Sequence, residues 1–282
     1  MLTHTFLHIP GIGQTTERML WEAKVHRWDE AIVALSAERI PPRIRKALAD
    51  GLSLSLEARR QRDVVFFADN LRPSDMWRLW AEFRHHACFL DIETTDLPPR
   101  GRITVASVAD WEQIKVFITG ENLWDLPKVL EQYQLVVTFN GCRFDIPMIA
   151  KRFPKWRRPC NHFDLLFPLK KLGYTGGLKP IMRRLRLPIQ PPLHLLDGWL
   201  APYLWREYKR GNGSALETLL AYNVSDVVHL PRLADFAYNM MVRSLAFRLP
   251  LFKYSPPLPN PYRADEALIR RLRNRFWWIP LP

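Results

Sequence analysis

Residues 89–95, Phe-Leu-Asp-Ile-Glu-Thr-Thr, constrain the fold of this chain more than any other stretch. They form a short apolar run in which Asp91 and Glu93 stand one residue apart. Side chains on a strand alternate between its faces, so both carboxylates should project to one side while Leu90 and Ile92 pack on the other. Neighbouring anions repel, and oxygen ligands on one face suit Mg²⁺ or Mn²⁺. Because an isolated Asp-x-Glu more often marks a solvated strand end, the metal-site interpretation depends on acids further along the chain.

A second apolar strand is predicted at residues 135–139, after a helical pattern over residues 123–133. A strand, helix and strand in succession imply a right-handed crossover, which places the two strands parallel and adjacent. Their carboxyl ends then meet, and Asp145 just beyond the second strand can reach Asp91 and Glu93. Between the two strands, residues 102–118 read as a β-hairpin.

Tyr222 and Asp226 supply a phenol and a further acid in a long helical region. Residues four apart project from one face of a helix. A phenol and a carboxylate aimed together at a metal site could orient an attacking water. Since Tyr-x-x-x-Asp is common in helices by chance, only its combination with the earlier acids is informative.

The charge of the chain predicts a polyanionic partner. Its 282 residues include 41 Lys and Arg against 28 Asp and Glu, for a net charge of +13, together with 11 Trp. This excess of cations is larger than solubility requires and favours nucleic acid. Cys88, Cys142 and Cys160 lack metal-ligand spacing and are expected to be reduced thiols. No apolar run or leader suggests a membrane, so a cytoplasmic protein is expected.

The chain divides into three predicted parts: a helical module (1–84), an α/β domain (85–245), and a Pro-rich linker with a basic, aromatic tail (246–282). In the first part, Gly11 and Gly13 form a turn that could bring backbone N–H groups to a phosphate, as in the hairpin of a helix-hairpin-helix motif. The turn could equally pack against the core. In the tail, Trp277 and Trp278 could stack on bases or dock the tail on the body.

Three short motifs resemble those of the DEDD superfamily, the DnaQ-like 3′–5′ exonucleases with a ribonuclease H-like fold. They are Asp91-x-Glu93, Asn140-x-x-x-Phe144-Asp145 and Tyr222-x-x-x-Asp226. The tyrosine marks the DEDDy branch, because the histidine of the DEDDh branch would stand where this chain has Ala221. The wider context, including the turn at residues 9–13 and the segment 204–211, resembles the YprB-like group of bacterial proteins.

This resemblance implies an α/β fold: a ribonuclease H-like mixed sheet flanked by helices, here with a small helical N-terminal module. It implies a 3′–5′ exonuclease that uses two Mg²⁺ or Mn²⁺ ions and prefers single-stranded DNA, with RNA possible. The four acids Asp91, Glu93, Asp145 and Asp226 would hold the ions, and Tyr222 would orient the nucleophilic water.

Substrate contacts are expected from Asn140, Arg143 and Phe144 of the second motif, and from Lys179 after a Gly-Gly turn. Asp164 is interpreted as structural. Two other functions stay open: a catalytically silent nucleic-acid-binding module that recruits a helicase or other partner, and a structure-selective endonuclease.

Overall fold

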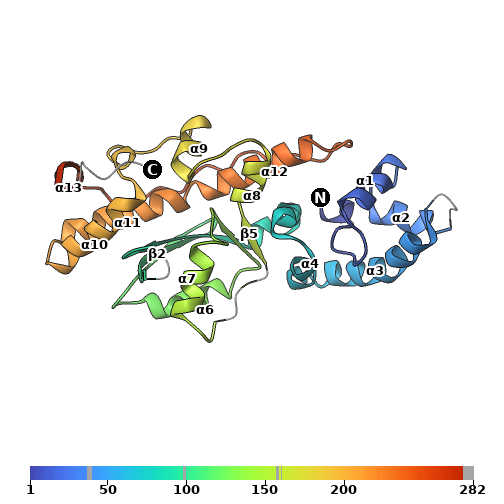
Figure 1. Cartoon of the computed structure of the whole chain (residues 1–282), viewed down its shortest axis with the longest axis horizontal. Coiled ribbons are helices and arrows are strands. Elements are labelled where there is room, and N and C mark those ends of the chain that lie inside the picture. The colour runs from blue at the N-terminus through green and yellow to red at the C-terminus, as the bar shows by residue number, and fades with distance from the viewer. Residues whose placement is uncertain (37–39, 98–99, 157–158, 160, 276–282) are drawn as a thin grey trace.

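The computed structural model describes residues 1–36, 40–97, 100–156, 159 and 161–275. In this part of the chain, five strands form one sheet in the order β3-β2-β1-β4-β5 (Figure 1). They are β1 (Ala87–Thr94), β2 (Ile103–Ala109), β3 (Ile114–Ile118), β4 (Leu135–Thr138) and β5 (His162–Asp164). β1, β2 and β3 are antiparallel neighbours, while β1, β4 and β5 run parallel. The predicted mixed sheet, its hairpin and the parallel pair β1–β4 are confirmed.

Helices cover both faces of the sheet (Figure 1). On one face lie α11 (Gly213–Val227) and α12 (Leu230–Arg243), and on the other lie α6 (Leu126–Leu130) and α7 (Asp145–Arg152). The alternation along β1 sorts its side chains: Phe89 packs in the core that includes α12, whereas Leu90 and Ile92 pack with α6 and α7. Since Asp91 and Glu93 share the face of Phe89, the carboxylates look toward the α11 side.

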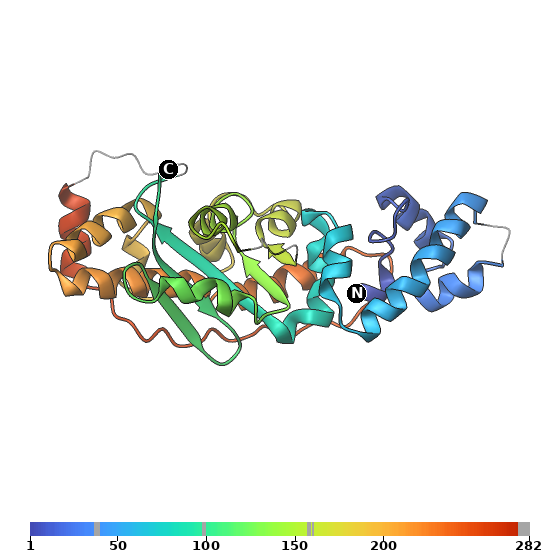
Figure 2. The same ribbon diagram turned by 90° about the horizontal axis from the view of Figure 1, so that it is seen from below.

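The chain before β1 is helical, and Figure 2 shows these helices at one end of the molecule. The elements are η1 (Leu2–His4), α1 (Gln14–Glu22), α2 (Trp28–Ala34), α3 (Pro42–Arg60), α4 (Val64–Asn70), η2 (Pro73–Leu79), α5 (Trp80–Phe83) and η3 (Arg84–His86). Trp28, Trp77 and Trp80 are each at most 1% exposed. Trp80 packs against Phe89 and Phe163 of the sheet and Trp77 against Tyr238 of α12, so buried aromatics join this region to the α/β domain.

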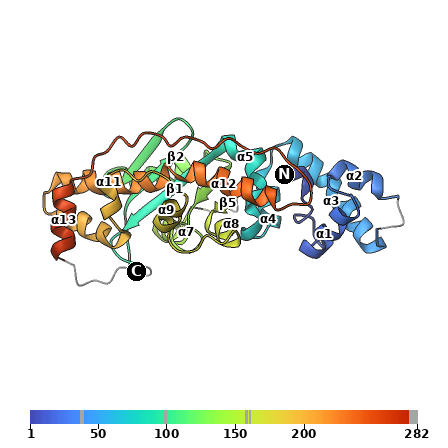
Figure 3. The same ribbon diagram turned by 90° about the horizontal axis from the view of Figure 1, so that it is seen from above.

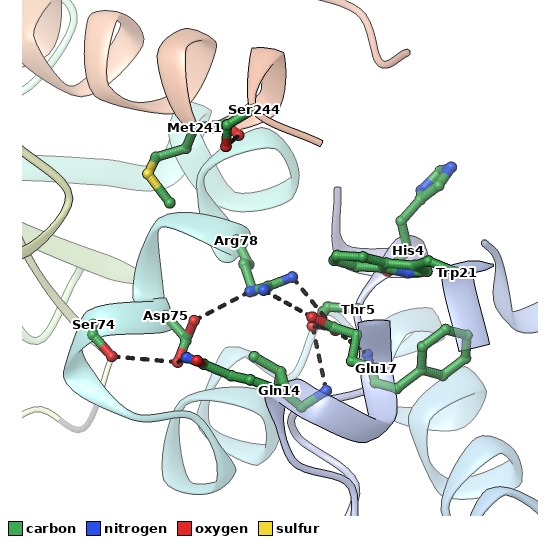
Figure 4. A network of polar contacts seen from close by, with 12 residues as sticks. His4, Thr5, Gln14, Glu17, Trp21, Ser74, Asp75, Arg78, Met241 and Ser244 are labelled. Atoms are coloured by element: carbon green, nitrogen blue, oxygen red, sulfur yellow. Dashed lines mark hydrogen bonds and ion pairs between the residues drawn. The ribbon is translucent and has the colours of Figure 1, made fainter. Parts of the chain in front are cut away.

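A buried ionic group, here called the Arg78 network, ties α1 to η2 (Figure 4). The Arg78 guanidinium lies 2.8 Å from a Glu17 carboxylate oxygen and 3.4 Å from one of Asp75. Glu17 also accepts hydrogen bonds from the Thr5 hydroxyl at 2.7 Å and the Phe6 N–H at 2.8 Å. These bonds satisfy charges that would otherwise be costly to bury.

Shorter elements complete the α/β region. They are η4 (Leu123–Asp125), α8 (Leu166–Lys171), α9 (Leu178–Arg184), η5 (Leu193–Leu195), η6 (Gly198–Leu200) and α10 (Ala201–Lys209). Cys88 and Cys142 are free thiols, and Cys160 lies outside the described residues. Within the described residues, no helix combines the length and apolar character needed to cross a membrane.

The C-terminal segment runs back along α12 and α11 and ends in α13 (Glu266–Arg275) (Figure 3). Asn260 donates a hydrogen bond to the Ala221 carbonyl at 2.7 Å. Leu268, Ile269 and Leu272 of α13 are buried in the core shared with α10 and α11. The segment up to residue 275 is thus docked on the domain. Trp277 and Trp278 lie outside the described residues, so their role remains a prediction.

Candidate metal centre

Three carboxylates meet where the end of β1 faces α11. Oxygens of Asp91, Glu93 and Asp226 all lie within 4.8 Å of one another, and these residues are called the acidic cluster below. Asp91 and Glu93 are half-buried, and Asp226 is 7% exposed. Because side chains alternate along a strand, Asp91 and Glu93 point toward α11. This helix carries Asp226, about one turn after Tyr222.

Asp91 is held in place by two successive hydrogen bonds that the sequence did not predict. The Asn223 amide donates to an Asp91 carboxylate oxygen at 2.6 Å and accepts a hydrogen bond from the Ser107 hydroxyl on β2. Asn223 and Ser107 are fully buried. A serine inside the mostly apolar strand β2 was the available signal, since a buried hydroxyl needs a partner.

Asp145 stands at the start of α7 and lines the same cavity as the acidic cluster. One of its carboxylate oxygens accepts a hydrogen bond from the Ile92 N–H at 3.1 Å, between the two acids of β1. It is therefore adjacent to the three clustered carboxylates but not within the 4.8 Å group. The acid also suits the positive end of the helix dipole.

The turn before Asp145 is shaped by Asp164, at the end of β5. Its carboxylate accepts from the N–H groups of Asn140 at 2.7 Å and Cys142 at 3.0 Å. Asn140 has a φ of 62°, a left-handed conformation that asparagine tolerates better than most residues. These hydrogen bonds agree with the structural role predicted for Asp164.

Tyr222 lies deep in the site and is 5% exposed. Its hydroxyl hydrogen-bonds Asp226, and a Cβ added at Gly198 would lie 3.6 Å from the hydroxyl oxygen. The phenol is therefore beside the acidic cluster, with a glycine leaving room next to it.

The expected phosphate contact of Lys179 is wrong for this structure. The side chain turns inward from α9 and is 8% exposed, because its ammonium donates to the carbonyls of Leu196 and Leu193. It also lies 4.0 Å from the centroid of the Tyr222 ring, a cation–π contact. Burial lowers the pKa of Lys179, and nearby carboxylates, Asp226 foremost, oppose that effect. The lysine is part of the interior of the site, not of its surface.

The remaining predicted substrate residues are divided. Asn140 and Phe144 line the cavity of the acidic cluster, which has a volume of about 720 Å³. Arg143 is exposed and is not among the residues that line it. The sequence reading missed another wall of the cavity, formed by η6 and α10: Trp199, Pro202, Tyr203 and Arg206.

Gly11 and Gly13 lie far from this site along the chain, in the turn before α1. Gly11 has a φ of +88°, which favours glycine, and Gly13 is the N-cap of α1. Only the single turn η1 precedes them in the described residues, so the first helix of a helix-hairpin-helix motif is not formed there. Asp69, Arg72 and Asp75 line the hollow beside the turn, so its charge does not decide for or against phosphate; the contact stays a prediction.

Burial and mutual repulsion make the acids hard to ionise together. The pKa of Asp91 is raised well above its usual range by burial first, then by Asp145, Glu93 and Asp226. Burial and Asp226 similarly raise the pKa of Glu93. Burial raises the pKa of Asp145 to about 7 and that of Asp226 to about 6. Close carboxylates in a buried site are an arrangement that a divalent cation would stabilise.

The donor set fits a hard cation. All ligands on offer are carboxylate oxygens, the choice of Mg²⁺ and Mn²⁺, with no thiolate or imidazole among them. The nearby ammonium of Lys179 is already bonded to backbone carbonyls. Among the described residues, the acidic cluster thus has no ion-paired guanidinium or ammonium to neutralise it.

Comparison with known proteins agrees with this geometry. The family model RNase_H_2, described as RNase_H superfamily, matches residues 88–238, more than half of the chain. The matched span contains the sheet from β1 to β5, the acidic cluster, Asp145 and Tyr222. No curated protein matches the chain. Its mixed sheet, the acids at the end of β1 and the extent of this match together lead to one conclusion: the chain belongs to the RNase H superfamily.

Proposed function

We propose that this protein is a 3′–5′ exonuclease of the DEDDy type, related to the YprB-like group, that hydrolyses phosphodiester bonds in single-stranded DNA. The observation that carries the proposal is the meeting of Asp91, Glu93 and Asp226 within 4.8 Å, beside Tyr222. Membership of the RNase H superfamily supports nuclease chemistry on nucleic acid with divalent ions.

In this proposal, Asp91, Glu93, Asp145 and Asp226 hold two Mg²⁺ or Mn²⁺ ions. When bound, such ions lower the pKa of water and stabilise the charge that develops on the leaving oxygen. Asn223 contributes by fixing Asp91, whose carboxylate it bonds at 2.6 Å. The Ile92 N–H does the same for Asp145 at 3.1 Å. A buried, pre-arranged set of ligands loses little freedom on binding cations.

Tyr222 would position the attacking water. Its hydroxyl bonds Asp226, so the phenol and the carboxylate act as one unit on the same helix face. The cation–π contact with Lys179 and the packing beside Gly198 keep the ring in place. A rigidly held hydroxyl beside the metal ligands suits the orientation of a nucleophile.

The cavity walls support a single-stranded substrate. Phe139 and Phe144 lie on one side and Trp199 and Tyr203 on another, all lining the 720 Å³ cavity. Arg206 lies over the Tyr203 ring, with its guanidinium carbon 5.1 Å from the centroid. Aromatic faces bind unpaired bases by stacking, and a guanidinium binds phosphate.

Degradation of end-labelled oligonucleotides tests the proposal. With Mg²⁺ or Mn²⁺, single-stranded DNA labelled at its 5′ end should give a ladder that shortens from the 3′ end. A circular single strand should survive, because an exonuclease has no end to attack. Cleavage of the circle would favour an endonuclease. Binding without any hydrolysis by either ion would favour a silent nucleic-acid-binding module.

A further inference from the structure

A second cavity, of about 590 Å³, lies between α1 and the α/β region. One face of α1 lines it, and the opposite side comes from η2 and the ends of α8 and α12; Figure 4 shows several of these side chains. Among the residues that the structure describes, it shares none of its lining with the cavity of the acidic cluster. It is therefore a separate place where a ligand can touch both parts of the chain.

The charged side chains at the buried end of this cavity, its floor, already neutralise one another. Arg78 is paired with Glu17 and Asp75 in the Arg78 network. Its guanidinium carbon lies 4.9 Å from the Trp77 ring centroid and 5.6 Å from that of Trp21. The charges at the floor thus balance one another. The exposed side chains around the opening, called the rim below, therefore determine which ligand is attracted.

The rim is mainly cationic. Arg18, Lys24 and Lys171 line the cavity, are exposed, and have no ion-pair partner within the described part of the chain. Glu22 is an acid on the same rim. Three unpaired cations at the mouth of a pocket favour an anionic ligand.

Flat, hydrogen-bonding side chains line the same cavity. Trp21 and His26, both half-buried, contribute ring surfaces, and Trp77 lies beneath them. Trp77 is 1% exposed, and its indole N–H has no hydrogen-bond partner in the described residues. A buried donor without a partner is costly unless a ligand supplies an acceptor. A planar group with acceptor atoms and a negative charge matches these features, and a nucleotide has all three.

We propose that this cavity binds a nucleotide of the single-stranded substrate, at a second contact remote from the acidic cluster. This inference rests on the proposed function, because it takes the substrate to be a nucleic-acid strand. In Figures 1 and 3, α8 and α9 lie between α1 and α11. Both carry exposed cations, among them Lys170 and Arg183. A strand leaving the acidic cluster would meet this basic surface before reaching the cavity.

Lys24 offers a test that does not depend on damaging the fold. It has a φ of +66°, a left-handed conformation that glycine adopts without strain. Lys24→Gly therefore removes a rim cation while relieving the backbone. Arg62→Gly is a matched control: Arg62 has a φ of +54° after α3, is exposed, and does not line the cavity.

The experiment measures binding of an oligothymidine of about 20 nucleotides by fluorescence anisotropy, in EDTA so that hydrolysis is excluded. Lys24→Gly should weaken binding by roughly three- to tenfold and reduce the slope of log K against log salt by about 0.7, the loss of one phosphate contact on a single strand. Arg62→Gly should change affinity by less than about twofold. Thermal midpoints of both variants should match or exceed that of the parent chain.

Hydrolysis of short strands separates this proposal from the proposed function. On oligonucleotides of about four residues, too short to span both places, Lys24→Gly should keep the parent kcat/KM. Equal losses of affinity in the two variants, or no loss in Lys24→Gly, would overturn the second contact. Parent chain that hydrolyses no strand at all would instead overturn the proposed function.

Discussion

Two groups of carboxylates lie below the surface of this molecule, and they are balanced in opposite ways. In the Arg78 network, Glu17 and Asp75 surround a guanidinium that is 6% exposed. Among the described residues, the three carboxylates of the acidic cluster, which lie within 4.8 Å of one another, form no ion pair with an Arg or Lys side chain; the ammonium of Lys179 is bonded to backbone carbonyls. The charges of the first group balance one another without a ligand, whereas a divalent cation would stabilise the second group.

The pKa values reflect this difference. Burial, and to a smaller extent Asp75, raise the pKa of Glu17, but Arg78, Thr5 and the Phe6 N–H all act to lower it. For Asp91, burial and three neighbouring acids all raise the pKa, and the hydrogen bond from Asn223 opposes them. A buried carboxylate with an internal cation indicates a structural role, and one surrounded by other acids indicates a ligand site.

The largest expected effect is on activity, from Asp226→Asn. The change removes a ligand oxygen's charge and keeps the shape of the side chain, so hydrolysis should fall by roughly 10³- to 10⁵-fold in single-turnover assays. Binding of single strands in EDTA should persist. Turnover within about tenfold of the parent would remove Asp226 from the site.

The Arg78 network should respond with lost stability instead. Arg78→Met leaves Glu17 and Asp75 buried without their cation, which costs about 3–5 kcal/mol of unfolding free energy. Urea titration measures this loss, and the folded fraction should hydrolyse oligonucleotides of about four residues at a rate near that of the parent. A loss below about 1 kcal/mol would mean that the network is not needed to hold α1 on η2.

Tyr222→Phe tests the phenol within the site. It removes the hydrogen bond to Asp226 while keeping the ring above Lys179, so the rate should fall by roughly ten- to a thousandfold with folding intact. A purely structural hydroxyl would give a different outcome: lower stability, by about 1–3 kcal/mol, and an unchanged single-turnover rate.

A smaller effect is expected on the pH dependence of stability in EDTA. Burial raises the pKa of Asp226 from 3.8 to about 6, so the folded chain holds this proton more tightly than the unfolded chain. The unfolding free energy of the parent chain therefore falls as the pH rises from 3.8 to about 6, because the folded chain must give up this proton. Asp226→Asn has no such proton and does not lose this stability. The unfolding free energy of Asp226→Asn should match that of the parent near pH 4 and exceed it by roughly 1–3 kcal/mol above pH 7. Urea titrations of both proteins at matched pH measure the difference, in which contributions from histidines cancel. If the stability difference between Asp226→Asn and the parent became smaller with rising pH, the pKa of Asp226 would not be raised in the folded chain.

Local patterns predicted much of this architecture. Alternation along residues 89–95 gave the common face of Asp91 and Glu93, and the crossover rule gave the parallel pair β1–β4. Contacts between distant segments were not predictable in the same way. Glu17 and Arg78 are 61 residues apart, and Asn223 and Asp91 are 132 apart. No local period encodes which partner a polar side chain will meet.

Lys179 shows the limit most clearly. A lysine after a Gly-Gly turn predicts a solvated cation, yet the carbonyls of Leu193 and Leu196 draw it inward. Those carbonyls belong to an irregular segment with a 3₁₀ turn, whose path follows from tertiary packing. The cavity wall at Trp199 and Tyr203 was missed for the same reason.

The most direct test is the shift in thermal midpoint that Mn²⁺ produces at pH 8, measured on three proteins. The parent chain and Glu17→Gln should both be stabilised by saturating Mn²⁺, because the acidic cluster is intact in each. Asp226→Asn should lose most of that shift. If Asp226→Asn kept the parent's shift, or if Glu17→Gln lost it, the acidic cluster would not be the metal site of this protein.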